Sequence, residues 1–309
     1  MHFHDKVAIV TGGGRDIGRA ISLKLAAAGA KVCINYANDD ASARDTLAQL
    51  QAAGGQGILH RADVTDATAV AGLLTATRTA FGQHIDVLIN VAGGMLARKP
   101  LADIDEAFFH QVMDLNLKSV YLTTQAVAPH MREGGAIVNF ASLAGRDGGG
   151  PGAAIYATAK AAVMTFSRAM AKELGPRGIR VNALCCGMIA TRFHDDFTKP
   201  EVRAFVANAT PLRREGRPEE AADAALYLAS DAASFINGAN LDVNGGVFFP
   251  DRQRRLAHGL AMDDDCDTEC GAGRPGHGAP GTPLGAGLDR LGDAGPARRR
   301  CRHAAAICR

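Results

Sequence analysis

Lys6-Val-Ala-Ile-Val-Thr-Gly-Gly-Gly-Arg-Asp-Ile-Gly18 is the stretch of sequence that decides the fold. Its β-branched residues up to Thr11 predict a short buried strand, and apolar residues at helical spacing from Ile17 to Ala28 predict a helix ended by Gly29. The glycines between them let the backbone approach a pyrophosphate, and the helix N-terminus supplies N–H donors. Placed between a first strand and a first helix, this loop indicates a nucleotide site.

The same alternation continues along the chain. Further strands are predicted near residues 31–36, 57–62, 85–90, 135–140 and 179–183, and helices near 40–53 and 66–81. Strands separated by helices imply a parallel sheet with helices on both faces, an α/β Rossmann-type doubly wound fold of one domain. Ligands of such sheets bind beyond the carboxyl ends of the strands.

Composition excludes several classes of protein. The chain has 309 residues, 47% of them hydrophobic, which is too apolar for a disordered chain. The net charge of +2 argues against nucleic-acid binding by bulk electrostatics. No apolar run approaches the ~20 residues of a membrane span. The start at residues 1–6 lacks the layout of a signal peptide, so we expect a cytoplasmic protein.

Composition changes sharply near Pro250. Residues 251–309 contain no Val, Ser, Phe, Tyr, Asn or Lys and show no helical or strand period. We therefore predict a catalytic domain over 1–250 and a disordered tail over 251–309, which is either a flexible extension or a stretch read out of its ancestral frame. Cysteines 33, 185 and 186 lie in strand-like stretches and are interpreted as buried fillers, whereas Cys266, Cys270, Cys301 and Cys308 lack zinc-site spacing, so no metal site is expected.

Tyr156-Ala-Thr-Ala-Lys160 is the most informative motif for chemistry. Residues four apart share a helix face, and a nearby ammonium stabilises a phenolate and lowers the phenol pKa. An ordinary helix face gives the same spacing, but three companions favour a site. They are Ser142 just after a predicted strand, Asn116 in Met113-Asp-Leu-Asn-Leu-Lys118, and the glycine-rich loop upstream.

Together these motifs resemble those of the short-chain dehydrogenase/reductases over roughly residues 5–249. The loop matches that family's Thr-Gly-x3-Gly-x-Gly at Thr11, Gly12 and Gly18, with Asp16 at the middle glycine. The resemblance implies an Asn-Ser-Tyr-Lys tetrad of Asn116, Ser142, Tyr156 and Lys160. In it the Tyr is the general acid of reduction, the Ser holds the carbonyl oxygen, the Lys bonds the nicotinamide ribose, and the Asn organises a water.

The resemblance also implies cofactor contacts. Asp16 is expected to cap the helix with its side chain, and Cys186, at the family's proline, to loosen the backbone. The second strand ends Asn35-Tyr36 without an acid, and Arg15 is placed to meet a 2′-phosphate, so NADP(H) is favoured and NAD(H) is the alternative. The implied cofactor residues are Gly12, Gly14, Arg15, Ile17, Gly18, Asn35, Asp63, Val64, Asn90, Ala92, Gly93, Tyr156, Lys160, Gly187, Ile189 and Thr191.

Loops set the substrate. Basic residues in three of them predict a cationic rim for a carboxylate, with Arg98, Arg146, Arg192 and His194 as candidate substrate residues. These loops resemble a bacterial branch that reduces the alginate-derived keto-uronate 4-deoxy-L-erythro-5-hexoseulose uronate, so a small-molecule carbonyl substrate is expected. The alternatives are a 3-oxoacyl-[acyl-carrier-protein] reductase, with Arg132 and Arg177 as docking residues, and a non-catalytic nucleotide sensor. Such enzymes are usually homotetramers.

Overall fold

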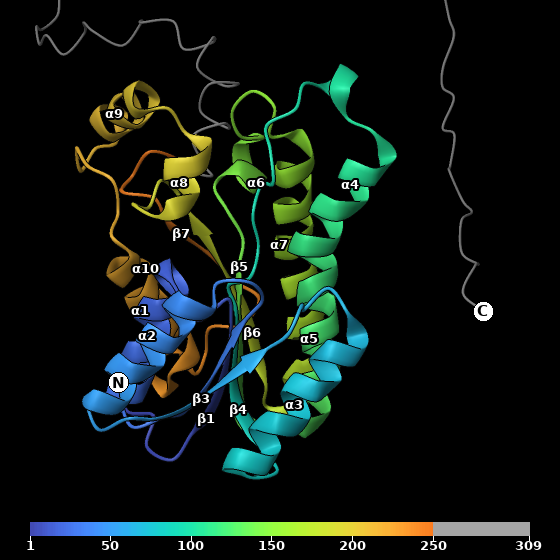
Figure 1. Ribbon diagram of the computed structural model, residues 1–309, viewed down its shortest axis with the longest axis vertical. Coiled ribbons are helices and arrows are strands. Elements are labelled where there is room, and N and C mark those ends of the chain that lie inside the picture. Colours follow the sequence, from blue (N-terminus) through green and yellow to red (C-terminus); the bar gives the residue numbers. More distant parts are fainter. Residues whose placement is uncertain (250–309) are drawn as a thin grey trace, which may run out of the picture. The chain divides into compact units, whose positions relative to one another are not determined.

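The computed structural model of this protein describes residues 1–249. The tail predicted for 251–309, with its four cysteines, lies outside the described residues. All strand pairs are parallel and follow the order β3-β2-β1-β4-β5-β6-β7 (Figure 1). The strands are β1 (Val7–Thr11), β2 (Lys31–Tyr36), β3 (Gln56–Arg61), β4 (Ile85–Asn90), β5 (Met131–Phe140), β6 (Arg180–Cys186) and β7 (Asn240–Val243).

Helices cover both faces of the sheet, as the alternating pattern predicts. One face carries α1 (Asp16–Ala27), α2 (Asp40–Ala52) and α10 (Pro218–Ala229). The other carries α3 (Ala67–Phe81), α4 (Glu106–Met113), α5 (Ser119–Val127) and α7 (Ala154–Leu174), as Figure 1 shows. Three further helices lie beyond the carboxyl ends of the strands: α6 (Ala144–Asp147), α8 (Arg192–Phe197) and α9 (Pro200–Ala209).

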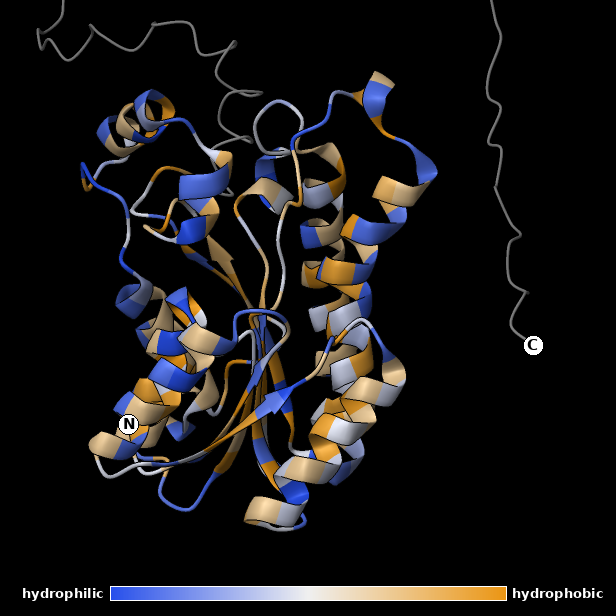
Figure 2. Ribbon diagram, viewed as in Figure 1, coloured by the Kyte–Doolittle hydropathy of each residue, from blue (hydrophilic) through white to orange (hydrophobic). Residues whose placement is uncertain are grey.

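The core follows from side chains that alternate between the faces of buried strands. In β1, Ala8 and Val10 pack into the cluster beneath α1 and α10, while Val7 and Ile9 pack into the cluster beneath α3 and α5. Figure 2 shows the same apolar centre between helices whose outer faces are polar. Fully burying one such Ile contributes ~1.5–3 kcal/mol, so these strands hold their carboxyl ends in fixed register.

Sequence-based boundaries were accurate at the centre of the sheet and less so at its far side. β2 and β4 span the predicted residues, whereas β5 begins at Met131 and β6 continues to Cys186. Both extensions come from pairing with neighbouring strands, Met131 with Ile85 and Cys186 with Val243. Cys186 is therefore part of the sheet, and the loosening expected from the missing proline stays a prediction. No helix in residues 1–249 is long and apolar enough to cross a membrane.

Candidate active site

Four side chains of the predicted tetrad come from three adjoining segments at the carboxyl edge of the sheet. Ser142 follows β5, Tyr156 and Lys160 lie on α7, and Asn116 lies in a π-helical turn, Asp114–Lys118, between α4 and α5. A π-turn inside a helix is frequent at functional sites. Asn116 is fully buried, and its side chain bonds the backbone N–H and carbonyl of Gly94 at 3.0 and 2.7 Å. The π-turn is thus bound to the loop after β4.

Gly93 is the point where this loop meets two members of the tetrad. A Cβ at Gly93 would lie 2.9 Å from both Asn116 Oδ1 and Lys160 Nζ. The Asn116 amide oxygen and the Lys160 ammonium therefore both lie against the Gly93 backbone, one of them an acceptor and the other a donor.

Burial controls the pKa values of the tyrosine and the lysine. Desolvation raises the pKa of Tyr156 to about 12, and a hydrogen bond with the Ser142 side chain opposes that rise. Desolvation also lowers the pKa of Lys160 to about 8, while its ammonium donates to the Phe140 carbonyl at 2.8 Å. Desolvation therefore dominates the pKa of Tyr156 in the protein by itself, and the lowering expected from Lys160 together with a bound nicotinamide stays a prediction. At neutral pH Tyr156 is a phenol, the form that donates a proton.

The glycine loop forms a cradle against the end of β4. Gly12 has φ +64°, and a Cβ there would lie 3.1 Å from the Ala92 backbone nitrogen. A Cβ on Gly18 would lie only 2.0 Å from the Gly12 carbonyl oxygen. Thr11, which the sequence analysis did not include among the site residues, accepts from the backbone N–H groups of Val91 and Ala92 at 3.1 and 3.2 Å. The loop can therefore receive an extended dinucleotide over the start of α1.

Asp16 does not cap α1 as expected. The structure places the N-cap at Arg15 without any side-chain capping bond, and Asp16 has φ +49°. This left-handed conformation is the reason a glycine suits the position. The Asp16 carboxylate instead accepts from the backbone N–H of Arg192, 3.3 Å away at the start of α8.

Two predicted cofactor residues are buried and form hydrogen bonds within the protein through their side chains. The Asn35 amide donates to the Ala62 carbonyl at 3.0 Å and accepts from Gly12 N–H at 3.4 Å. The Asn90 amide donates to Asn139 at 2.8 Å. The other predicted cofactor residues lie between β1 and the first turn of α1 or just after β3 and β6, on the same edge of the sheet: Gly14, Ile17, Asp63, Val64, Gly187, Ile189 and Thr191.

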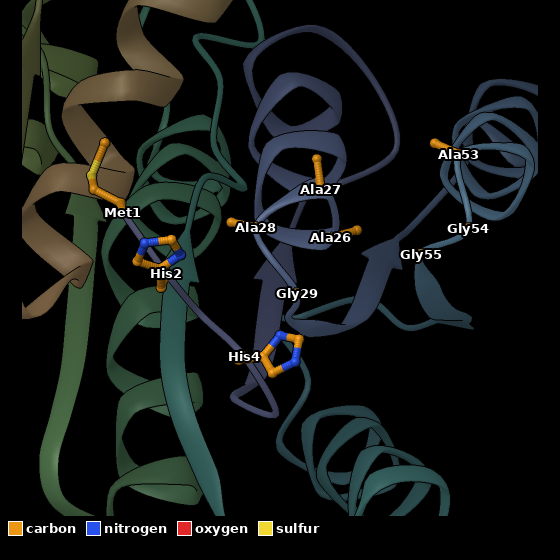
Figure 3. Close-up of a pocket in the computed structure, with 10 residues that line it drawn as sticks. All are labelled: Met1, His2, His4, Ala26, Ala27, Ala28, Gly29, Ala53, Gly54 and Gly55. Carbon is orange, nitrogen blue, oxygen red and sulfur yellow. The ribbon is translucent and has the colours of Figure 1, made fainter.

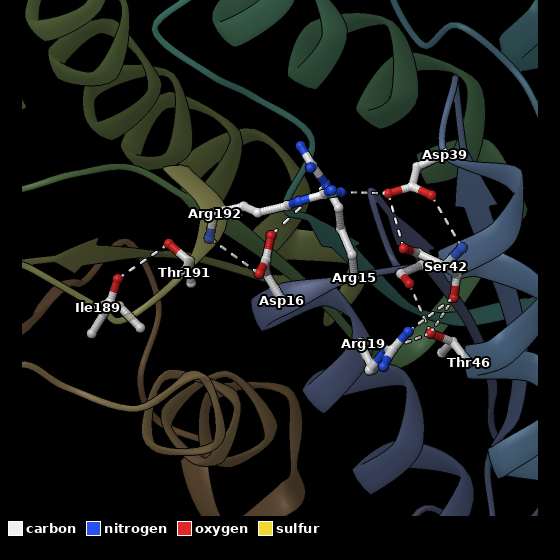
Figure 4. A network of polar contacts seen from close by, with 10 residues as sticks. Arg15, Asp16, Arg19, Asp39, Ser42, Thr46, Ile189, Thr191 and Arg192 are labelled. Carbon is white, nitrogen blue, oxygen red and sulfur yellow. Dashed lines mark hydrogen bonds and ion pairs between the residues drawn. The ribbon is translucent and has the colours of Figure 1, made fainter. Parts of the chain in front are cut away.

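Beside the cradle, Arg15 is half exposed, and the nearest carboxylate to its guanidinium, that of Asp16, is 3.8 Å away. The structure adds an acid that the sequence analysis overlooked. Asp39, in the loop after β2, caps α2 by accepting from Ser42 N–H and pairs with Arg192 at 2.9 Å (Figure 4). These hydrogen bonds to Ser42, together with the positive charges of Arg192 and Arg15, lower the pKa of Asp39. The sequence feature that could have identified Asp39 is its place as an N-cap residue before α2, since it does not stand at the end of the strand.

The predicted cationic rim does not form as a set of free charges. Arg146 binds Asp242 at 3.1 Å, and Arg192 binds Asp39. Burial lowers the pKa of His194 to about 4, so its imidazole is neutral. Arg98 differs, because its guanidinium donates to the carbonyls of Phe197 and Pro151 at 2.9 and 3.0 Å and has no acid partner within residues 1–249.

An aromatic side chain that the sequence analysis did not single out covers the tyrosine. The ring centroid of Phe193, on α8, lies 5.7 Å from that of Tyr156 and 5.3 Å from that of Phe197. The site therefore has an aromatic wall beside Tyr156.

A cavity of about 470 Å³ lies at the opposite edge of the sheet (Figure 3). It is lined by residues that precede β1, β2 and β3, such as His4, Gly29 and Gly55, and by no carboxylate. No cluster of metal-ligating side chains occurs in the part of the chain that the structure describes. The carboxyl edge is thus the place where acid–base groups and a nucleotide cradle meet.

A parallel sheet with this cradle and tetrad defines a nicotinamide-dependent oxidoreductase of the Rossmann class. The family model described as "Enoyl-(Acyl carrier protein) reductase" matches residues 12–248. The chain belongs to the short-chain dehydrogenase/reductase family, whose members bind NAD(P) and act on CH–OH and C=O groups.

Relatives of known name support this membership. A 3-oxoacyl-[acyl-carrier-protein] reductase of Synechocystis is 41% identical over 78% of this chain and 96% of its own. The structure of an NADH-dependent reductase "responsible for alginate metabolism" is 37% identical, with a TM-score of 0.73 over 80% of this chain and 99% of its own. A Burkholderia cenocepacia short-chain dehydrogenase in complex with NADP is 31% identical, with a TM-score of 0.74 over the same shares.

Proposed function

We propose that this protein is an NADPH-preferring carbonyl reductase that acts on a small acidic ketone or aldehyde of the keto-uronate type. The observation that carries the proposal is Arg98. Arg98 lies in the loop after β4, and its guanidinium donates to the main-chain carbonyls of Pro151, in the loop after β5, and Phe197, at the end of α8. Because both partners are carbonyls, no acid of the described chain neutralises its charge. A carboxylate is the natural partner of such a cation. The alginate-metabolism relative supports the same substrate class.

The residues then divide the work of reduction. When bound, the nicotinamide supplies the hydride. Tyr156, a phenol at neutral pH, donates its proton to the carbonyl oxygen, which Ser142 holds by a hydrogen bond. Lys160 would bind the nicotinamide ribose, and with Asn116 it holds the water that returns a proton to Tyr156. The glycine cradle at Gly12 would receive the pyrophosphate.

For the cofactor, we propose NADPH because Arg15 stands half exposed beside the cradle. Asp39 supports the alternative, NADH, since a carboxylate after β2 accepts hydrogen bonds from a ribose hydroxyl. In the structure this carboxylate is already bonded to Ser42 and Arg192, which favours NADPH.

The second candidate is a 3-oxoacyl-[acyl-carrier-protein] reductase, which the identity of 41% to the Synechocystis enzyme favours. The basic residues predicted to dock the carrier do not support it. Arg132 lies at the start of β5 and Arg177 just before β6, at the edge of the sheet opposite Ser142. Arg177 also donates to the carbonyls of Ala128 and Met131.

The test offers the keto-uronate and an acetoacetyl thioester in parallel, each with NADPH and with NADH. Oxidation of NADPH by the keto-uronate alone supports the proposal, and preference for the thioester moves the assignment to the second candidate.

Arg98→Met should raise KM for the keto-uronate about tenfold, because it removes one charge-assisted hydrogen bond. KM for a neutral ketone should be unchanged. Activity that survives Tyr156→Phe would contradict the mechanism, and nucleotide binding without turnover of any carbonyl would revive the sensor alternative.

We also propose a cytoplasmic homotetramer. β7 is an edge strand, and Leu241 on it is 36% exposed; Phe235, which precedes β7, is fully exposed, and Tyr227 on α10 is partly exposed. An apolar sheet edge favours pairing with another copy of the chain. Light scattering of purified protein tests this, and a monomeric mass at micromolar concentration would contradict it.

A further inference from the structure

Arg192, at the start of α8, contacts the start of α1 and the loop after β2 (Figure 4). Its guanidinium pairs with Asp39 at 2.9 Å, and its backbone N–H donates to Asp16 at 3.3 Å. Arg192 thereby contacts Asp39 and Asp16, which precede it in the sequence by 153 and 176 positions.

Sheet order shows what this link crosses. Asp39 follows β2 and Arg192 follows β6, and β1, β4 and β5 lie between these strands. Neighbouring strands are about 4.8 Å apart, so the connection runs along the carboxyl edge across the cradle at Gly12.

We propose that Arg192 is a positioning residue that clasps α8 over the nucleotide cradle through Asp39 and Asp16. The proposal rests on the nicotinamide site of the proposed function and moves Arg192 from the substrate to the cofactor side. Because Phe193 is the next residue and packs on Tyr156, the same contacts keep an aromatic ring over the proton donor.

The opposite end of α8 is held independently. Arg98 bonds the Phe197 carbonyl, and Arg203 pairs with Asp195 and, at 2.7 Å, with Glu215. Breaking the clasp therefore frees only the end of α8 that faces the cradle. Arg192 and Asp39 are 58% and 30% exposed, and an exposed ion pair is weak enough to open and close readily.

A double-mutant cycle separates a clasp from two independent charges. The variants are Asp39→Asn, which retains a good N-cap for α2, Arg192→Gln and their combination. Arg44→Gln is the matched control, because Arg44 pairs with Asp40 on the same helix without crossing the cradle. The readouts are the dissociation rate of NADPH, followed by its fluorescence, and hydrogen exchange of α8 amides in the cofactor-free protein.

With a clasp, each single variant should raise the dissociation rate about threefold, the size expected of an exposed pair, and the double variant no further. Amides of α8 should exchange faster in all three, Arg44→Gln should match the wild type, and Arg192→Lys should restore part of the effect. Independent charges instead predict that Asp39→Asn slows release of the anionic nucleotide. That result, additive effects, or unchanged exchange would overturn the clasp while leaving the proposed function intact. Failure of the wild type to bind either nucleotide would instead refute the proposed function, and the exchange measurement would still test the clasp.

Discussion

At the scale of single residues, Lys160 shows how the site conflicts with stability. Its burial lowers the pKa to about 8 from the ordinary 10.5. The unfolded chain therefore binds this proton more tightly than the folded protein does. The resulting destabilisation is complete below about pH 8 and is relieved as pH rises from there toward 10.5. At ~1.4 kcal/mol per pKa unit, it reaches about 3 kcal/mol.

We accordingly expect Lys160→Met to change stability in a pH-dependent way. Relative to wild type, its free energy of unfolding should be most favourable near neutral pH and should lose that advantage between about pH 8 and 10.5. Urea denaturation across this range measures the difference. The exposed Lys199→Met is the control, and a difference independent of pH would contradict the argument.

Gly93 gives a second prediction at this scale. A Cβ there meets Asn116 Oδ1 and Lys160 Nζ at 2.9 Å, so Gly93→Ala must displace one of them. We expect kcat to fall at least tenfold, since positioned proton transfer contributes 10²–10⁴-fold in rate, by order of magnitude. Steady-state kinetics and circular dichroism test this, with Gly72→Ala on α3, where a Cβ approaches nothing closer than 3.7 Å, as control. Unchanged kcat would show that the two groups do not act together.

At the scale of elements, the segment from β5 to α7 owes its position to an edge strand. Arg146, on α6, binds Asp242 of β7 through two nitrogens at 3.1 and 3.2 Å and the Asn240 carbonyl at 2.8 Å. Both side chains are less than one fifth exposed. The ion pair therefore ties the loop that carries Ser142 to the end of the sheet.

Arg146→Gln should loosen that loop. Removing one partner of a mostly buried pair leaves the Asp242 carboxylate poorly compensated, and we expect a loss of about 2 kcal/mol in stability. The catalytic rate should fall several-fold, with nucleotide affinity unchanged, because Ser142 moves and the cradle does not. Thermal denaturation and nucleotide titration measure the two effects. Equal losses in nucleotide affinity and rate would indicate general unfolding instead.

At the scale of the whole molecule, the sheet and its two helical layers are complete within the described residues 1–249. We therefore propose that residues 1–250 form an independent catalytic domain. A chain ending at Pro250 should keep the wild-type midpoint of thermal unfolding and the wild-type kcat. Calorimetry and steady-state kinetics of the truncated and full chains test this, and a large loss of either would show that 251–309 contributes to the fold.

Local pattern predicted the first six strands and the first three helices, and the resemblance to a known family implied the tetrad. The alternation of buried strands and amphipathic helices is a short-range property, so β2 and β4 were predicted to the residue. Likewise, Tyr156 and Lys160 share a helix face because of their spacing. Nothing in that reasoning required knowing which distant residues meet.

Only the tertiary structure decided how charges pair and which groups are desolvated. Arg146, Arg192 and His194 have the composition of an anion site, yet two of them meet Asp242 and Asp39 from distant segments and the third is neutralised by burial. The raised pKa of Tyr156 likewise reflects its desolvation within the fold. The sequence thus determined the alternation of strands and helices that defines the fold class, because short-range periodicity sets it. The fold decided which side chains remain free for a ligand, because pairing and desolvation depend on contacts between residues far apart in the chain.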